Sequence, residues 1–413
     1  MNLAATASTS TYILRSIARE HALPLRAHTR RVIHSKLPVT PTSSYLARQR
    51  TFTSSSRRQN APSTSSSTLD AAPKSASLSS PARPFTFHVG LSFIAKPVQE
   101  DDGPPPNVIP FPDDHPVIGF RNRMLAWPKE VPIDSAGHDF FFVQEMRNKS
   151  GLAVGIADGV GGWGDILDPS QFSQGLMYYA SEVAAQNWPG EPESDPLSEE
   201  AVYVPGDQLS PIDCMEQAFR RVAKDKAVQG GASTACVMTF DAAKGRMQAA
   251  NIGDSGFYVI RGAKILHAQN PQQHYFNCPK QLSKFPPGFD TSRAIQDLPR
   301  DADTYSLGLQ HGDIIVAYTD GLSDNVYRQE TLHYVMSSMR RPPVLSTNLP
   351  RTTETPNNSS MPEDQIKAQF LADFLVIHAR RCMFDFGRVS PFEEEWAKSQ
   401  RSKRVYRGGK IDE

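Results

Sequence analysis

Three short turns in this 413-residue sequence place an aspartate next to a glycine directly after an apolar stretch. They contain Asp158-Gly159, Gly253-Asp254 and Asp320-Gly321, and a fourth glycine-rich turn ends at Asp412. Hard divalent cations such as Mg²⁺ and Mn²⁺ take carboxylate, carbonyl and water oxygens as ligands, and a glycine lets its own carbonyl approach an ion closely. One Asp-Gly pair alone is more often an ordinary turn, but three of them after apolar strands predict a carboxylate metal site.

One of these turns also suggests a different chemistry. The segment Gly253-Asp254-Ser255-Gly256 resembles the turn that carries the nucleophilic serine of chymotrypsin-like proteases. Such an enzyme needs a histidine base and a buried aspartate earlier in the chain. His138, followed by Asp139, is the available pair. Because the metal-site pattern already accounts for this turn, the protease is the weaker hypothesis.

The apolar periodicity predicts the elements that position these turns. Strands are expected over 85–89, 140–144, 152–157, 235–240, 247–251, 256–261, 264–267 and 314–318, and helices over 171–185, 212–228, 330–339 and 365–384. Strands in runs with helices interspersed indicate an α+β fold in which helices pack outside antiparallel sheets. We expect one folded domain over 84–413, with a flexible insertion rich in Pro, Thr and Asn over 341–362.

The charge distribution separates a leader from this domain. Ten basic residues and one acidic residue, Glu20, precede Asp70, although the net charge of the whole chain is zero. Residues 1–83 are rich in Ser, Thr and Arg, and 12–18 can form a helix with one apolar face. This composition is typical of a mitochondrial transit peptide followed by a disordered segment. We therefore expect a mitochondrial protein, in the matrix.

The remaining composition excludes several classes of protein. From Asp70 onward the chain carries 34 basic and 43 acidic residues, the wrong balance for binding nucleic acid. No apolar run reaches 18 residues, so no membrane-spanning helix is expected. The four cysteines lack C-x-x-C spacing, which argues against a structural zinc site or a disulfide framework. The basic stretch 401–410 is expected to be solvated.

Several motifs occur in the order found in the metal-dependent protein phosphatases of type 2C, and the sequence resembles that family over roughly 84–413. The matching segments are 137–139 (GHD), 157–163 (ADGVGGW), 231–234 (GAST), 251–256 (NIGDSG), 319–325 (TDGLSDN) and 408–412 (GGKID). Segments 168–173 (DPSQFS) and 273–279 (QHYFNCP) resemble the mitochondrial subgroup found from fungi to animals.

The resemblance implies a fold, an activity and a set of ligands. The fold would be a four-layer αββα sandwich of two antiparallel sheets between helices. The enzyme would hydrolyse phosphoserine and phosphothreonine on mitochondrial phosphoproteins, using water activated by two Mg²⁺ or Mn²⁺ ions. By the same resemblance, Asp158 would bridge both ions, Gly159 would offer its carbonyl, Asp320 and Asp412 would bind one ion, Asp254 would hold a weaker third ion, and Asp139 would orient the water.

The sequence departs from the family pattern at several positions. His138 stands where the family usually has Glu, and Val160 stands where many relatives have a histidine that can act as general acid. The place of the phosphate-binding arginine holds Asp134, with Arg123 and Lys129 as possible substitutes. The family continues past the last aspartate with a core strand, whereas this sequence ends one residue later. These departures keep a catalytically silent binding protein of the same fold as the alternative hypothesis.

Overall fold

The computed structural model describes residues 85–97, 109–127, 135–146, 149–163, 167–188, 192–193, 202–203, 209–340, 362–401 and 404–412. The described residues all belong to one compact unit within Ser77–Glu413. The predicted leader over 1–83 lies outside the described residues, as does the predicted insertion over 341–362 except for its last residue. Within the described part of the chain, no helix is both long enough and apolar enough to cross a membrane.

The strands form two principal antiparallel sheets. The first has the order β1-β2-β6-β7-β13 and the second the order β14-β8-β9. Their bounds are β1 Phe140–Glu145, β2 Gly151–Ala157, β6 Ala235–Asp241, β7 Arg246–Ile252, β13 Asp303–Gly308, β14 Ile314–Tyr318, β8 Gly256–Arg261 and β9 Lys264–Ala268. Short two-stranded pairs join β3 (Pro192–Glu193) with β4 (Val202–Tyr203), β5 (Gly231–Ser233) with β12 (Leu282–Lys284), and β10 (Gln273–Tyr275) with β11 (Cys278–Pro279).

The helices pack outside these sheets. Their bounds are α2 Pro116–Leu125, α3 Pro169–Asn187, α4 Pro211–Lys224, α5 Asp320–Ser323, α6 Arg328–Arg340, α7 Glu363–Met383 and α8 Pro391–Ser399. Proline at the first helical position, after Asp or Ser, begins α3, α4 and α8. Proline favours that position because its fixed φ suits a helix and its missing N–H would have had no partner there.

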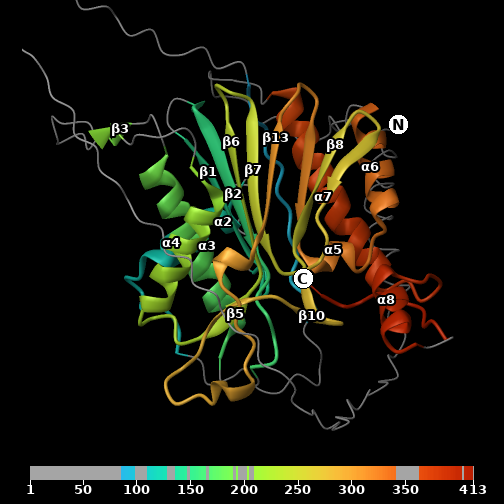
Figure 1. Cartoon of the computed structure of the whole chain (residues 1–413). Helices are drawn as coiled ribbons and strands as arrows, with labels where there is room; N and C mark the ends of the chain where they lie inside the picture. The colour runs from blue at the N-terminus through green and yellow to red at the C-terminus, as the bar shows by residue number, and fades with distance from the viewer. Residues whose placement is uncertain are drawn as a thin grey trace, which may run out of the picture. The chain divides into compact units, whose positions relative to one another are not determined.

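Three apolar clusters show that the sheets and helices form four layers. On β6, Val237 joins a cluster with Phe172 of α3, while the next residue, Met238, joins a second cluster with Phe257 of β8. Side chains alternate between the faces of a strand, so the second cluster lies between the two sheets. A third cluster joins β8 and β14 to α6 and α7, which lie beside that sheet in Figure 1. The predicted αββα sandwich is confirmed.

The segment 85–97 differs from its predicted secondary structure. It is not a strand, although Phe85, Phe87 and Val89 pack on the apolar cluster between the sheets. The side-chain amide of Gln365 on α7 accepts from Val89 N (3.2 Å) and donates to Val89 O (2.6 Å). Gln369 makes the same pair of hydrogen bonds with Leu91. The backbone groups that a neighbouring strand would satisfy are therefore satisfied by glutamines of a helix.

Strand β13 was not predicted because only two of its residues are apolar, Tyr305 and Leu307, which alternate with exposed residues and pack on the apolar cluster between the sheets. Asp303, Thr304, Ser306 and Gly308 are exposed, and β13 lies at the edge of the five-stranded sheet. An edge strand with one face in water needs few apolar residues. Its register with β7, in which Asp303 pairs with Asn251, brings its first residue close to the end of β7 that leads into the Asp254 turn.

Candidate metal centre

Three aspartates meet where three buried strands end. Asp158 directly follows β2, Asp254 lies in the turn between β7 and β8, and Asp320 begins α5 two residues after β14. One carboxylate oxygen from each of the three lies within 4.8 Å of the others. Asp254 and Asp320 are buried and Asp158 is half-buried. The two sheets of the sandwich therefore bring together residues that are up to 162 positions apart in the sequence.

Further carboxylates surround these three. The pKa of Asp158 is raised well above its ordinary value by burial, and the charges of Asp139, Asp320, Asp412 and Asp254 raise it further. Burial also raises the pKa of Asp324 to about 6, with Asp254 and Asp412 adding to the rise. We call this group the carboxylate cluster; its members are Asp139, Asp158, Asp254, Asp320, Asp324 and Asp412.

The turns that hold Asp158 and Asp254 are tied to each other through Thr234. The Asp158 N–H donates to Thr234 Oγ1 (3.0 Å), and the Thr234 N–H donates to the Asp158 carbonyl (3.0 Å). Thr234 Oγ1 also pairs with Ser255 Oγ (2.7 Å), the residue after Asp254. Gly253 has φ +100, and a Cβ there would lie 2.6 Å from the Thr234 side chain, so the turn needs glycine.

A glycine is also required next to Asp158. A Cβ on Gly159 would lie 2.6 Å from the His138 carbonyl oxygen and 3.1 Å from that of Pro169, which are backbone atoms of two other segments. The close packing holds Gly159 in a bridge with Ser233. It fixes the backbone beside the carboxylates, as the predicted role of the Gly159 carbonyl requires.

The donor set fits hard divalent cations. Every donor in the cluster is a carboxylate oxygen, the type preferred by Mg²⁺ and Mn²⁺. Burial raises the pKa of Asp158, Asp254 and Asp320, because loss of water disfavours the charged form. Neighbouring carboxylates raise each pKa further, because like charges oppose ionisation. Buried charges of one sign need a counter-charge. The cluster therefore has both the ligands and the unbalanced charge of a metal site.

Lys410 supplies part of that counter-charge. Its ammonium contacts the carboxylates of Asp320, Asp324 (3.0 Å) and Asp412 (2.7 Å). Only 19% of its side chain is exposed, so the prediction that 401–410 is a solvated stretch is wrong at this residue. A lysine two positions before an aspartate carries no sequence signal for burial. The contact is visible only once the chain end folds back onto α5.

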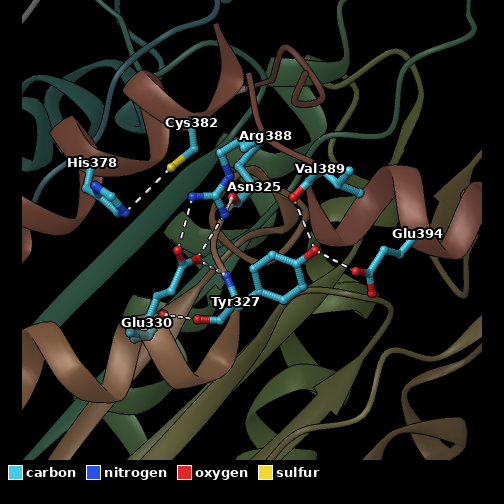
Figure 2. A network of polar contacts seen from close by, with 9 residues as sticks. Asn325, Tyr327, Glu330, His378, Cys382, Arg388, Val389 and Glu394 are labelled. Atoms are coloured by element: carbon cyan, nitrogen blue, oxygen red, sulfur yellow. Dashed lines mark hydrogen bonds and ion pairs between the residues drawn. The ribbon is translucent and has the colours of Figure 1, made fainter. Parts of the chain in front are cut away.

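The chain end is held by a group of polar residues, which we call the Arg388 network; they lie on α6, on α8, between α5 and α6, and between α7 and α8. It consists of Asn325, Tyr327, Glu330, Arg388 and Glu394 (Figure 2). Arg388 donates two hydrogen bonds to Glu330 (2.9 and 3.1 Å) and one to the Asn325 carbonyl (3.1 Å). Tyr327 Oη donates to the Val389 carbonyl and pairs with Glu394.

Asn325 links this network to the cluster. Its amide donates to the Gly321 carbonyl, next to Asp320, and to the Lys410 carbonyl, both at 2.9 Å. The Gly408 N–H donates to the Arg388 carbonyl (2.9 Å), and the Gly409 N–H donates to the Met383 carbonyl (3.1 Å). The segment that carries Asp412 is therefore fixed against α5 and the end of α7. Asn325 lies within a motif noted in the sequence, but its linking role depends on contacts 85 positions apart.

The Asp254 side of the cluster is contacted by the β10–β11 hairpin. Gln273 donates from Nε2 to Asp254 Oδ2 (2.9 Å). In the same hairpin, Phe276 packs against Phe392 of α8, with ring centroids 5.1 Å apart. The hairpin, which the sequence associates with the mitochondrial subgroup, thus touches both Asp254 and the helix beside the chain end.

The structure describes some of the positions where the sequence departs from the family pattern, but not all of them. His138 has a lowered pKa because of burial and the charge of Lys96, so its ring is neutral at pH 7. Arg123 lies on α2, where its charge acts on Tyr178, away from the carboxylates. Lys129 and Asp134 lie outside the described residues.

The serine of the protease hypothesis is not placed for nucleophilic attack. Ser255 is fully buried, and its hydroxyl pairs with Thr234. Such a serine needs an accessible hydroxyl that pairs with a histidine base. The described contacts of Ser255 instead serve to connect the turns of the carboxylate cluster.

Comparisons with known proteins identify phosphatases as relatives. The chain is 39% identical over 191 residues to the "Protein phosphatase PTC7 homolog" of Danio rerio, covering 46% of this chain and 58% of the relative. It is 30% identical over 216 residues to the "5-azacytidine resistance protein azr1" of Schizosaccharomyces pombe, covering 52% and 65%. The matches span less than two thirds of these relatives. The predicted resemblance to protein phosphatases is confirmed.

Structural comparison and family models add two findings. Among solved structures, the photosystem II phosphatase PBCP aligns with 67% of this chain and 88% of its own, at 25% identity and a TM-score of 0.46. No family model matches the chain.

Proposed function

We propose that this chain, a relative of the PTC7 phosphatase homologues, is a metal-dependent protein phosphatase of type 2C that hydrolyses phosphoserine and phosphothreonine. The observation that carries the proposal is the meeting of Asp158, Asp254 and Asp320 within 4.8 Å at the ends of three strands. Burial and repulsion by neighbouring carboxylates raise the pKa of Asp158, so the ionised cluster needs counter-charge. The protein phosphatases among the relatives support the choice of reaction.

The ligand roles are those that the family resemblance implies, and the closeness of the carboxylates supports them. Asp158, whose pKa responds to four neighbouring carboxylates, would contact both cations. The Gly159 carbonyl would complete one ion's shell, Asp320 and Asp412 would hold the other, and Asp254 would hold a further ion. Two divalent cations, when bound, lower the pKa of a bound water and neutralise charge that develops on the phosphoryl group.

The chain's own residues then position the reactants. Asp139, directly before β1 and within electrostatic range of Asp158, orients the attacking water and accepts its proton. Three candidate nucleophiles are not placed for attack: Ser255 is paired with Thr234, and burial raises the pKa of Cys214 and of Cys236 to about 12. The geometry therefore favours direct attack by water on phosphorus.

We further propose that the enzyme acts on mitochondrial phosphoproteins. The basic, acid-poor leader over 1–83 supports import, and it lies outside the described residues. The cluster adds a constraint on the substrate. A site lined by carboxylates repels the phosphate dianion unless cations are bound, so substrate binding should depend on the same metal ions as turnover.

The test is phosphate release from a protein phosphorylated on serine, using the full chain with Mn²⁺ and then with EDTA. Metal-dependent release supports the proposal, and circular dichroism in both buffers shows whether the chain stays folded. A folded chain that binds Mn²⁺ but releases no phosphate from any phosphoprotein would contradict the proposal in favour of the silent binding protein. That alternative rests on the departures from the family pattern, among them His138 and Val160.

A further inference from the structure

Lys410 occupies an unusual place for a lysine. Its backbone is fixed, because the Asn325 amide donates to its carbonyl (2.9 Å) and the preceding Gly409 N–H donates to the Met383 carbonyl (3.1 Å). Its side chain extends from this anchor into the carboxylate cluster, and its ammonium lies 5.6 Å from the centre of the Phe392 ring. The four-carbon arm can move without any change in the segment that carries Asp412.

The ammonium is held there by charge. It forms ion pairs with Asp320, Asp324 (3.0 Å) and Asp412 (2.7 Å), and only 19% of its side chain is exposed. These three carboxylates therefore hold the ammonium in the cluster. Two of its three partners, Asp320 and Asp412, are the residues assigned to one metal ion under the proposed function, on which this inference rests.

A divalent ion and this ammonium cannot both be favourably placed on the same carboxylates. Two cations that contact a shared carboxylate lie a few ångströms apart and repel each other in a site with little water. An ammonium is a compact charge on a flexible stem, so it can leave toward solvent when a stronger cation arrives. The contacts of Lys410 are therefore those of a competitor for the ion.

We propose that Lys410 is a tethered counter-ion, which holds Asp320, Asp324 and Asp412 together in the metal-free chain and is displaced when a divalent cation binds Asp320 and Asp412. The affinity for the ion at that position is then set by competition with a charge built into the chain. Metal loading becomes dependent on the concentration of free Mn²⁺ or Mg²⁺, while the metal-free chain keeps its ligand loop in place.

The test is a Mn²⁺ titration of the full chain, with free Mn²⁺ read from its electron paramagnetic resonance signal. Lys410→Met keeps the length of the side chain and removes its charge. It should bind the ion assigned to Asp320 and Asp412 at least about fivefold more tightly, within the usual range of coupling between competing sites. Lys96→Met is the matched control. This exposed lysine acts on the pKa of His138 rather than on a cluster carboxylate, so the Mn²⁺ affinity of this variant should differ from that of the wild type by less than twofold.

A third variant guards against failure to fold. Lys410→Arg retains the positive charge and offers a planar group that pairs well with two carboxylates, so it should fold and bind Mn²⁺ no more tightly than the wild type. The inference is supported if Lys410→Met binds Mn²⁺ most tightly, the wild type less tightly and Lys410→Arg least tightly. Equal or weaker binding by Lys410→Met, or an equal change in Lys96→Met, would overturn it. If the wild type itself takes up no Mn²⁺, the proposed function fails rather than the role of Lys410.

Discussion

The Arg388 network pairs opposite charges, whereas the carboxylate cluster brings like charges together. In the network, Arg388 and Glu330 form a bidentate pair, and their hydrogen bonds hold the pKa of Glu330 below and that of Arg388 above the ordinary values. In the cluster, burial raises the pKa of Asp158, Asp254 and Asp320. The network is therefore stabilised by its charges, whereas the cluster is destabilised by them.

The contrast separates a scaffold from a site. A matched pair needs nothing from outside the chain, so the network can fix the segment that carries Asp412 under all conditions near neutral pH. In an unmatched cluster the carboxylates repel each other. A bound cation reduces this repulsion, and the reduction contributes to the free energy of ion binding. Asn325 connects the two regions, because its backbone carbonyl accepts from Arg388 and its side chain donates to the Lys410 carbonyl.

The largest expected effect comes from removing the central charge of the cluster. Asp158→Asn should lower phosphatase activity by at least about 10³-fold, because the ions lose the ligand that joins them and with it several kcal/mol of transition-state stabilisation. The measurement is phosphate release at saturating Mn²⁺. Asp241→Asn is the matched control, since Asp241 is also buried but lies at the far end of β6. Equal losses in the two variants would break the comparison.

A second change acts where the network meets the cluster. A Cβ on Gly409 would lie 2.2 Å from Asn325 Oδ1 and 2.6 Å from Met383 Cα, so Gly409→Ala should displace the segment that carries Asp412. We expect Mn²⁺ affinity to fall about 10-fold, which corresponds to about 1.4 kcal/mol. Calorimetric titration measures the effect. Gly308→Ala, which would meet nothing within 4 Å, should bind as the wild type does; unchanged affinity in Gly409→Ala would show that this segment is not positioned by the network.

A third change weakens the scaffold alone. Glu330→Gln should lower the free energy of unfolding by about 1–2 kcal/mol at pH 7, since the pair is partly exposed and loses a charge-assisted hydrogen bond. A lowered folded-state pKa means that Glu330 stabilises the protein above its ordinary value of 4.5, and that this stability is lost as the pH falls through the folded value.

Urea unfolding at pH 7 and at pH 4 measures that difference. The gap between the wild type and Glu330→Gln should be full at pH 7 and smaller at pH 4. A gap that stays constant or grows on acidification would show that the pair does not stabilise the fold through the charge of Glu330.

The sequence predicts the cluster better than it predicts the network. An Asp-Gly turn after an apolar strand marks the end of that strand in the local sequence. The local pattern, together with the packing of sheets, therefore predicts that Asp158, Asp254 and Asp320 lie close together. Lys410 and Arg388 look like ordinary basic surface residues, because the contacts that bury them come from segments distant in the chain.

The same reason accounts for the errors in secondary structure. Residues 85–89 alternate as a strand does, but the backbone of Val89 bonds to the side chain of Gln365 on α7 rather than to a neighbouring strand. Strand β13 has only two apolar residues, Tyr305 and Leu307, and its backbone pairs with β7. Periodicity reports which side chains are buried, and it cannot report which partner completes the backbone hydrogen bonds.

The central claim is that the carboxylate cluster binds metal ions because its charges are unmatched. Thermal unfolding of the wild type and Asp158→Asn, each in EDTA and in Mn²⁺, tests this claim. Mn²⁺ at 100 times its dissociation constant should stabilise the wild type by about 2.7 kcal/mol. In EDTA at pH 7, Asp158→Asn should be more stable than the wild type, because a carboxylate with a raised pKa costs stability above its unfolded value, and Mn²⁺ should stabilise it less. A wild type that melts at the same temperature in EDTA and Mn²⁺, or an Asp158→Asn variant that is less stable in EDTA, would contradict the account.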